Sequence, residues 1–184
     1  MINHHTNDPG SFGDTYTMSA EEKSATKVFL IDDEPLILEL YEVFLATAGF
    51  DNVYAFSDSV EAIETLRFLT PSIILTDIHM PEVSGNFLIK LIRTYEHLRT
   101  VPVVAITSDK AEESQKITMR KGADLVMHKP VNSATLAKCV TQVMASTNKL
   151  KIQLSEADQR EQKLNEQKKA AMMSLESDLR NMMR

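Results

Sequence analysis

Acidic, basic and hydroxyl side chains follow several apolar runs of this chain, where they could act together. The segments are Asp32-Asp33, Asp77, Thr107-Ser108 and His128-Lys129-Pro130. Asp77 ends the run IILTD, and Pro81, four residues later, prevents regular structure from continuing. A carboxylate at the end of a buried run is costly unless it is paired, hydrogen-bonded or bound to a metal. We therefore expect a cation or hydrogen-bond donors around Asp77.

Three carboxylates, an ammonium group and a hydroxyl in one place predict a site for an anionic, oxygen-rich group. Asp32, Asp33 and Asp77 would repel one another unless a cation lay among them, and such oxygen ligands suit Mg²⁺. Lys129 adds positive charge, and Thr107 adds a hydroxyl donor. A carboxylate in this setting could attack a phosphoryl donor, with the metal and Lys129 offsetting charge on the phosphoryl oxygens. We interpret Asp77 as that nucleophile.

A simpler interpretation is that these carboxylates only cap helices, because aspartate is common at strand-to-helix turns. Capping accounts well for Asp58 and Asp109 and partly for Asp32-Asp33. It does not account for Lys129 or Thr107. We therefore favour the chemical site.

The elements that would position these residues alternate along the chain. Apolar runs predict strands at Val28–Ile31, Val53–Phe56, Ile73–Thr76, Val101–Ile106 and Asp124–Met127. Helical spacing of apolar residues predicts helices at Pro35–Ala48, Asp58–Leu69, 85–98, Asp109–Lys121 and from Ser133 onward. Asp58 with Glu61 and Asp109 with Glu112 predict capping boxes at two of the helix starts.

A strand followed by a helix, repeated five times, predicts an α/β fold. Short strands that are almost wholly apolar are typical of parallel strands covered on both faces. We expect a doubly wound five-stranded parallel sheet, flavodoxin-like and of (βα)5 order, in a domain of about 120 residues. Such sheets bind ligands at the carboxyl ends of their strands, which is where the polar segments lie.

Both ends of the chain lie outside this pattern. Residues 1–26 are polar and are expected to form a disordered arm in which His4 and His5 are solvated. After Pro130 there is no further Pro or Gly, so the last helix could continue to Arg184, giving roughly 50 residues and about 75 Å. We expect a domain at residues 27–148 and a helical extension at residues 149–184.

A heptad frame through the extension indicates an imperfect coiled coil. Its positions are Leu150, Leu154, Ala157, Glu161, Leu164, Lys168, Ala171, Leu175, Asp178 and Met182. Glu161, Lys168 and Asp178 weaken the seam. The extension is therefore a dimerising helix, a signalling linker or a frayed solvated helix.

Composition excludes several classes of protein. The net charge of −6 argues against a general nucleic-acid binder, which would carry a basic face. No run approaches the roughly 18 apolar residues of a membrane span, and no secretory signal begins the chain. The single cysteine, Cys139, excludes an intrachain disulfide and fits a reducing compartment. We expect a cytoplasmic protein.

Four motifs, in order, make the chain resemble the receiver domain of response regulators in two-component signalling, over about residues 27–146. The motifs are Ile31–Pro35, Asp77–Pro81 with Gly85 following, Ala105–Ser108, and Lys129-Pro130 after Gly122–Asp124. The resemblance implies a phosphoacceptor that takes a phosphoryl group from a histidine kinase or phosphotransfer protein. The resemblance implies that the chain is not an enzyme and catalyses no reaction other than this transfer.

The resemblance also implies roles for individual residues. Asp77 would be the phosphoacceptor, contacted through its phosphoryl group by Thr107 and Lys129. Asp33 would bind Mg²⁺ directly and Asp32 largely through water, with Asp77 and the backbone carbonyl of His79 as further ligands. In this family the peptide bond after the lysine is usually cis.

Two positions depart from or vary within the family. Where an aromatic side chain often swings during switching, three residues before the lysine, this chain has Val126. The usual readout is therefore in doubt. His79 and Asp109 lie two residues after Asp77 and Thr107. The resemblance implies that these positions flank the water route to the acyl phosphate. We hypothesise that they set the lifetime of the phosphoryl group; the alternative is two solvated loop side chains.

Three functions were compared. The first is a phosphorylatable receiver that switches a protein interaction or dimerisation through residues 149–184. The second is a receiver-like adaptor that dimerises without phosphorylation, which Val126 favours. The third, a phosphohydrolase, is disfavoured because Asp32 and Asp33 are adjacent and lie on a different strand from Asp77.

Dinucleotide binding is disfavoured because no Gly-rich fingerprint follows the first strand.

Overall fold

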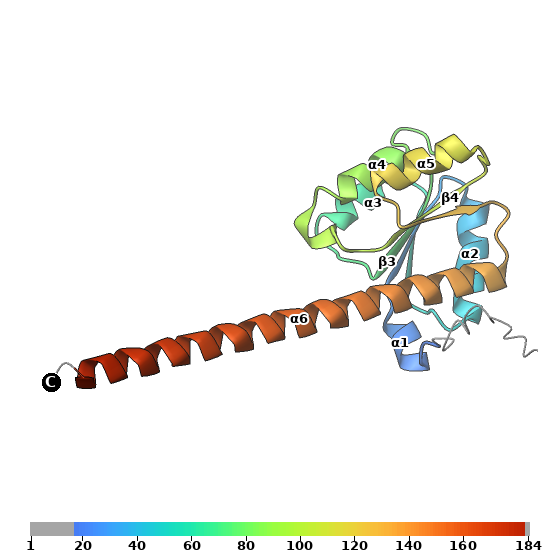
Figure 1. The fold of residues 1–184 in the computed structure, drawn as a ribbon. Coiled ribbons are helices and arrows are strands. Elements are labelled where there is room, and N and C mark those ends of the chain that lie inside the picture. The colour runs from blue at the N-terminus through green and yellow to red at the C-terminus, as the bar shows by residue number, and fades with distance from the viewer. Residues whose placement is uncertain (1–16, 183–184) are drawn as a thin grey trace, which may run out of the picture. The chain divides into compact units, whose positions relative to one another are not determined.

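The computed structural model describes residues 17–182 (Figure 1). In the last helix it does not describe the side chains of residues 151, 154, 170, 171 and 173–182. His4 and His5, and most of the expected disordered arm, lie outside the described residues.

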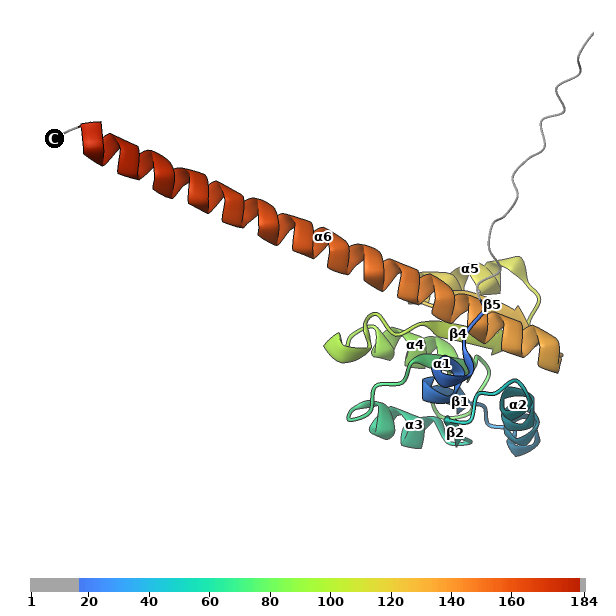
Figure 2. The ribbon, with the colours of Figure 1, turned by 90° about the horizontal axis from the view of Figure 1, so that it is seen from below.

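The centre of the fold is a five-stranded parallel sheet. Its strands are β1 (Val28–Ile31), β2 (Val53–Phe56), β3 (Ile73–Asp77), β4 (Val103–Thr107) and β5 (Leu125–His128). Their order across the sheet is β2-β1-β3-β4-β5, and the four strands labelled in Figure 2, β2, β1, β4 and β5, follow it. Strand order reverses between β1 and β3, so the predicted doubly wound fold is confirmed, with the acidic segments at the reversal.

Helices cover both faces of the sheet (Figure 1). They are α2 (Pro35–Thr47), α3 (Ser59–Leu66), α4 (Gly85–Ile92), the short 3-10 helix η1 (Glu96–Leu98), α5 (Glu112–Lys121) and α6 (Ser133–Met182). The start of α6 lies with α2 on one face, and α3, α4 and α5 lie on the other.

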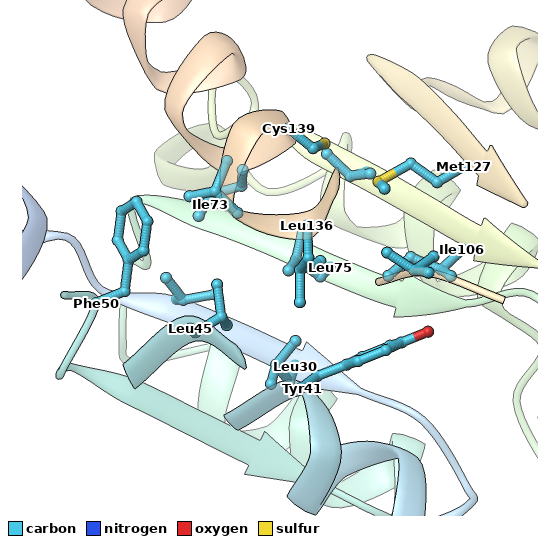
Figure 3. Packing of buried hydrophobic residues seen from close by; sticks show 14 of the residues in the cluster. Leu30, Tyr41, Leu45, Phe50, Ile73, Leu75, Ile106, Met127, Leu136 and Cys139 are labelled. Atoms are coloured by element: carbon cyan, nitrogen blue, oxygen red, sulfur yellow. The ribbon is translucent and has the colours of Figure 1, made fainter. Parts of the chain in front are cut away.

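Alternate residues of each strand enter two separate cores. In β1, Val28 and Leu30 pack with α2 and α6, whereas Phe29 and Ile31 pack with α3 and α4. Figure 3 shows the first core, where Leu30 and Leu75 of the sheet meet Tyr41 and Leu45 of α2. The three central strands β1, β3 and β4 are buried at every position, which explains their largely apolar sequences, whereas the edge strands β2 and β5 are partly exposed.

Three of the predicted helices differ clearly in their bounds, and the first of these, predicted to end at Leu69, ends at Leu66. The helix predicted at 85–98 ends at Ile92 and is followed by η1. The helix predicted to start at Asp109 starts at Glu112 instead, and its cap residue Ala111 has no side-chain cap. The Asp109 carboxylate accepts the Ala111 N–H at 2.8 Å, so it closes a local turn rather than a capping box. Asp58 does cap α3, as predicted.

The N-terminal segment is the main correction. Residues Ala20–Ala25 form a helix, α1, with a capping box between Ser19 and Glu22. Met18 is buried in the first core. The ammonium group of Lys23 donates to the Ala48 carbonyl at 3.0 Å, at the end of α2. The expectation of disorder is therefore wrong for residues 17–26, which contain a capped helix attached to the domain through Met18 and Lys23.

The last helix is continuous from Ser133 to Met182, so the predicted extended C-terminal helix is confirmed. Contacts divide the chain into two units, residues 1–145 and 146–184. The domain boundaries predicted from the sequence stay predictions. In the second unit Leu150, Ile152 and Leu164 are exposed. None of the helices among the described residues is long and apolar enough to cross a lipid bilayer.

Candidate functional site

Asp77 is the last residue of β3 and is only 5% exposed. Its oxygen Oδ1 lies 2.9 Å from the Nζ atom of Lys129. Its other oxygen, Oδ2, accepts the backbone N–H of His79 at 2.5 Å. Each carboxylate oxygen therefore has a partner, one of them cationic, which makes burial of the charge tolerable.

Lys129 bridges two buried carboxylates. Its Nζ atom lies 2.8 Å from Asp32 Oδ2 as well as 2.9 Å from Asp77 Oδ1, and the Lys129 side chain is 13% exposed. Exposed Glu34 lies farther away, at 3.4 Å. Burial alone would lower the pKa of Lys129, but hydrogen bonds and charge from Asp32 and Asp77 outweigh it and raise that pKa. The ammonium form is therefore the stable one at neutral pH.

Asp32 is the first residue after β1 and is 3% exposed. Burial raises the pKa of its carboxyl, and the hydrogen bonds from Lys129 and from the Glu34 N–H offset this only in part. The Glu34 N–H donates to Asp32 Oδ1 at 3.1 Å, a turn that leads into α2 at Pro35. One cation thus serves two carboxylates, and the buried part of the site keeps a net negative charge.

The start of α4 is packed against the backbone of Asp77. A Cβ atom at Gly85 would lie 2.0 Å from the Asp77 carbonyl oxygen, closer than any side chain can approach. The Gly85 N–H also donates to the Ile78 carbonyl at 3.0 Å. Glycine is therefore required here, and it fixes α4 directly behind the candidate acceptor.

The ends of β4 and β5 form the other side of the site. Thr107 is 5% exposed, and its hydroxyl accepts the Asp109 N–H at 3.1 Å. Its carbonyl accepts the Lys129 N–H at 2.8 Å, which ties the lysine backbone to β4. The Lys129-Pro130 peptide bond is cis, as the resemblance implied. Val126 is buried in the second core.

The Asp33 carboxylate does not lie with those of Asp32 and Asp77. It lines a pocket of about 200 Å³ together with Asp58, Met80 and Glu82, and neither Asp32 nor Asp77 lines that pocket. Among the described residues no group of three His, Cys, Asp or Glu side chains is spaced as a metal site. The donor types nevertheless suit Mg²⁺, because Asp32 and Asp77 are hard oxygen ligands that already share one positive group.

His79 and Asp109 line one pocket of about 90 Å³, beside Thr107. Hydrogen bonds from Ser114 and from the Ala111 N–H lower the pKa of Asp109, and the charges of His79 and His128 add to this. The structure therefore brings His79 and Asp109 to one place. Within the described residues it shows no ion pair between them.

Sequence analysis missed two contributors to this site. Glu34 reaches Lys129 from the start of α2, and its position directly after Asp32-Asp33 was the available signal. Asn86, the second residue of α4, lines the pocket of His79 and Thr107. Nothing in the sequence distinguished Asn86 from an ordinary helix residue.

Comparison with known proteins assigns a family to most of the chain. Residues 28–141 match the response regulator receiver domain family. The polar-differentiation response regulator DivK of Brucella ovis is 29% identical over 105 residues, which cover 57% of this chain and 85% of DivK.

Solved structures agree with that assignment. The chemotaxis response regulator CheY4 of Vibrio cholerae is 26% identical with a TM-score of 0.61, covering 64% of this chain and 98% of CheY4. The receiver domain of the sensor histidine kinase PA1611 from Pseudomonas aeruginosa, described with magnesium in its active-site cleft, is 22% identical with a TM-score of 0.61. It covers 65% of this chain and 98% of its own, and supports the fold alone.

Proposed function

This chain belongs to the response regulator receiver domain family of two-component signalling, and from that we propose that Asp77 is its phosphoacceptor. A histidine kinase or phosphotransfer protein would be the donor. The observation that carries the proposal is the Asp77 carboxylate, at the carboxyl end of the central strand and 2.9 Å from the Lys129 ammonium. A nucleophile for phosphoryl transfer needs such a cation to offset charge on the phosphoryl oxygens.

The transfer forms one bond and breaks one. An Asp77 oxygen attacks phosphorus, and the bond from phosphorus to the donor's histidine nitrogen breaks, returning its electron pair to that nitrogen. Lys129 stays within reach of the new phosphoryl oxygens, and the Thr107 hydroxyl turns from acceptor to donor toward them. Asp77 keeps its amide contact with His79 throughout. The chain acts as a phosphoryl acceptor in signalling and is not proposed to turn over an external substrate.

Mg²⁺ is part of the proposal. Asp32, Asp33, Asp77 and the backbone carbonyl of His79 would hold it, and it would supply the positive charge that Lys129 alone cannot give to three carboxylates. Asp33 has to turn toward Asp32 and Asp77 for this, because it lines the neighbouring pocket.

We also propose that His79 and Asp109 set the lifetime of the phosphoryl group. Both side chains line the pocket beside Thr107, and the charge of His79 contributes to the lowered pKa of Asp109. Their position lets them restrict the approach of water to phosphorus.

The proposed output is a switched protein interaction or homodimer through residues 149–184. The exposed apolar residues Leu150 and Leu164 support it, because they lie on the heptad seam. The alternative is an adaptor that dimerises without phosphorylation. Val126 favours this alternative, since it is buried, short and β-branched and has no ring to swing.

The direct test is phosphoryl uptake from acetyl phosphate with Mg²⁺, followed by intact mass. The wild-type chain should gain one phosphoryl group that hydroxylamine removes, and Asp77→Asn should gain none. Asp58→Asn is the matched control, because Asp58 is an acidic residue just after β2 whose carboxylate accepts the Val60 and Glu61 N–H groups at the start of α3. Uptake by Asp77→Asn, or none by the wild type with donor and metal, would contradict the proposal.

A further inference from the structure

Glu34 is a charged residue beside the candidate site that the proposed function does not use. Its oxygen Oε1 lies 3.4 Å from Nζ of Lys129, and that nitrogen lies 2.9 Å from Asp77 Oδ1. The Glu34 and Asp77 oxygens therefore cannot be farther apart than these two distances together. That separation is shorter than the Debye length of about 8 Å at physiological ionic strength, so salt screens Glu34 only in part from a group on Asp77.

The exposure of Glu34 places its charge on the solvent side of the site. The Glu34 side chain is 64% exposed, whereas that of Asp77 is 5% exposed. Glu34 is the cap residue of α2, but its side chain makes no capping hydrogen bond there. The carboxylate is therefore not needed for the helix start, and a phosphoryl donor that approaches Asp77 from solvent comes near its charge.

The charges of the proposed site balance without Glu34. Lys129 and the proposed Mg²⁺ together carry as much positive charge as the three aspartates of that site carry negative charge. Glu34 adds one further negative charge to this set, and like charges repel one another at short range even through water. A donor phosphoryl group is itself anionic, so Glu34 should oppose its approach more strongly the more negative the donor is.

We propose that Glu34 selects among phosphoryl donors by charge. It disfavours free dianionic donors and favours a donor whose phosphoryl group is accompanied by positive charge, as on a protein that presents a basic side chain to Glu34. This inference rests on the proposed function and deepens it by naming the class of donor. The bonds that form and break are those of the transfer described above, and Glu34 neither gains nor loses a proton.

The experiment compares the initial rates of phosphoryl uptake from two small donors at saturating Mg²⁺ and low salt. Acetyl phosphate is a dianion at neutral pH, whereas phosphoramidate carries an ammonium group on its phosphorus and is a monoanion. Glu34→Gln should raise the rate about fourfold with acetyl phosphate and about twofold with phosphoramidate. Glu34→Lys should change the ratio of the two rates twice as far on a logarithmic scale, and Glu34→Asp should keep the wild-type ratio.

The ratio of the two rates separates a role in charge from a role in structure. If Glu34 merely held Lys129 in place, Glu34→Gln would change both rates by the same factor, and that result overturns the inference. Salt at about 1 M, where the Debye length is about 3 Å, should remove most of the change in ratio. Glu39→Gln is the matched control, because Glu39 is an exposed glutamate farther along α2. A change in ratio as large as that of Glu34→Gln would overturn the assignment to Glu34.

Beryllofluoride binding with Mg²⁺ gives a second measurement, at equilibrium and without a donor. Glu34→Gln should bind this anionic mimic about twofold more tightly than the wild type, and equal affinities would contradict the charge argument. If the wild type takes up no phosphoryl group from either donor, the proposed function fails, and this inference fails with it. If Asp77 is phosphorylated but the ratio of rates is the same in every Glu34 variant, the inference alone is overturned.

Discussion

The ammonium nitrogen of Lys129 lies 2.9 Å from Oδ1 of Asp77, across the carboxyl edge of the sheet from β5 to β3. The same nitrogen lies 2.8 Å from Asp32. Two nearly buried carboxylates thus depend on one cation. Removing the ammonium group would leave the two carboxylates uncompensated, and removing the carboxylates would leave the ammonium group uncompensated, where water solvates them poorly.

Replacing Lys129 with methionine should destabilise the fold. The change keeps the apolar stem but leaves Asp32 and Asp77 unpaired, and breaking a buried pair from one side costs about 3 kcal/mol or more. Urea unfolding in EDTA should show that loss, and Mg²⁺ should recover part of it because the metal would replace the missing charge. Lys116→Met is the control, since its pair with Glu112 is exposed and contributes little. Equal stability of Lys129→Met and wild type in EDTA would contradict this account.

Replacing His79 with alanine should shorten the phosphoryl lifetime. The imidazole lines the pocket beside Thr107, so its loss opens the approach of water, with an expected gain of about fivefold in the rate of loss. Asp109→Ala and the double variant complete a cycle that measures how strongly the two residues act together. His97→Ala is the control, because His97 lies in η1 and contacts the Leu66 carbonyl instead. If His79→Ala and the wild type lose the phosphoryl group at the same rate, His79 is only a solvated loop residue.

The sheet was predictable because local and global signals agree in this chain. Parallel strands that pack on both faces are mostly apolar, and five short apolar runs correctly located the five parallel strands. Polar residues at strand ends then had to meet at one edge, and Asp32, Asp77 and Lys129 do. The missed helix α1 had a signal in the sequence, the Ser19–Glu22 capping box, that the polar composition of the segment concealed.

The start of α5 and the placement of Asp33 could not be predicted from the spacing of residues in the sequence. Asp109 and Glu112 have the spacing of a capping box, but the Asp109 carboxylate accepts the Ala111 N–H instead, and the helix starts later. Adjacent residues after a strand point in different directions, so Asp33 lines a neighbouring pocket while Asp32 pairs with Lys129. The first outcome reflects a local side-chain hydrogen bond that competes with the helix start, which residue spacing alone does not reveal.

The stability of the protein should fall at alkaline pH because of Cys139. Burial raises the pKa of this thiol to about 11 in the folded protein, whereas an unfolded cysteine ionises near pH 8.5. A raised folded-state pKa means that the unfolded form loses its proton first. Stability is therefore unaffected below about pH 8.5 and declines from there to about pH 11, by about 3 kcal/mol.

Cys139→Ala provides the comparison for this pH effect. It should lower stability at neutral pH through lost packing, but the difference from the wild type should shrink between pH 7.5 and pH 10.5. Lysine and tyrosine groups titrate in both proteins and cancel in that difference. A constant difference across this range would show that Cys139 ionises in the folded protein as it does in water.

Dimerisation through residues 149–184 should depend on the heptad seam and on the phosphoryl state. Leu150→Lys and Leu164→Lys place charge on the seam, where both wild-type leucines are exposed in the single chain. Ile152→Lys is the matched control, because Ile152 is equally apolar and exposed but lies off the seam. Light scattering with Mg²⁺, before and after adding beryllofluoride, should show a monomer that becomes a dimer in the wild type and in Ile152→Lys, but not in the seam variants.

Each result of that measurement selects one function. A dimer that forms only with beryllofluoride means that Asp77 controls the helix even though Val126 has no ring. A dimer in both states, still disrupted by Leu150→Lys, supports the constitutive adaptor, in which phosphorylation would change another partner surface. A monomer in both states, with beryllofluoride binding confirmed separately, makes α6 a linker rather than a dimerisation element. If Ile152→Lys disrupted the dimer as strongly as Leu164→Lys, the predicted seam would be contradicted. Of these two residues, the heptad frame places only Leu164 at the interface.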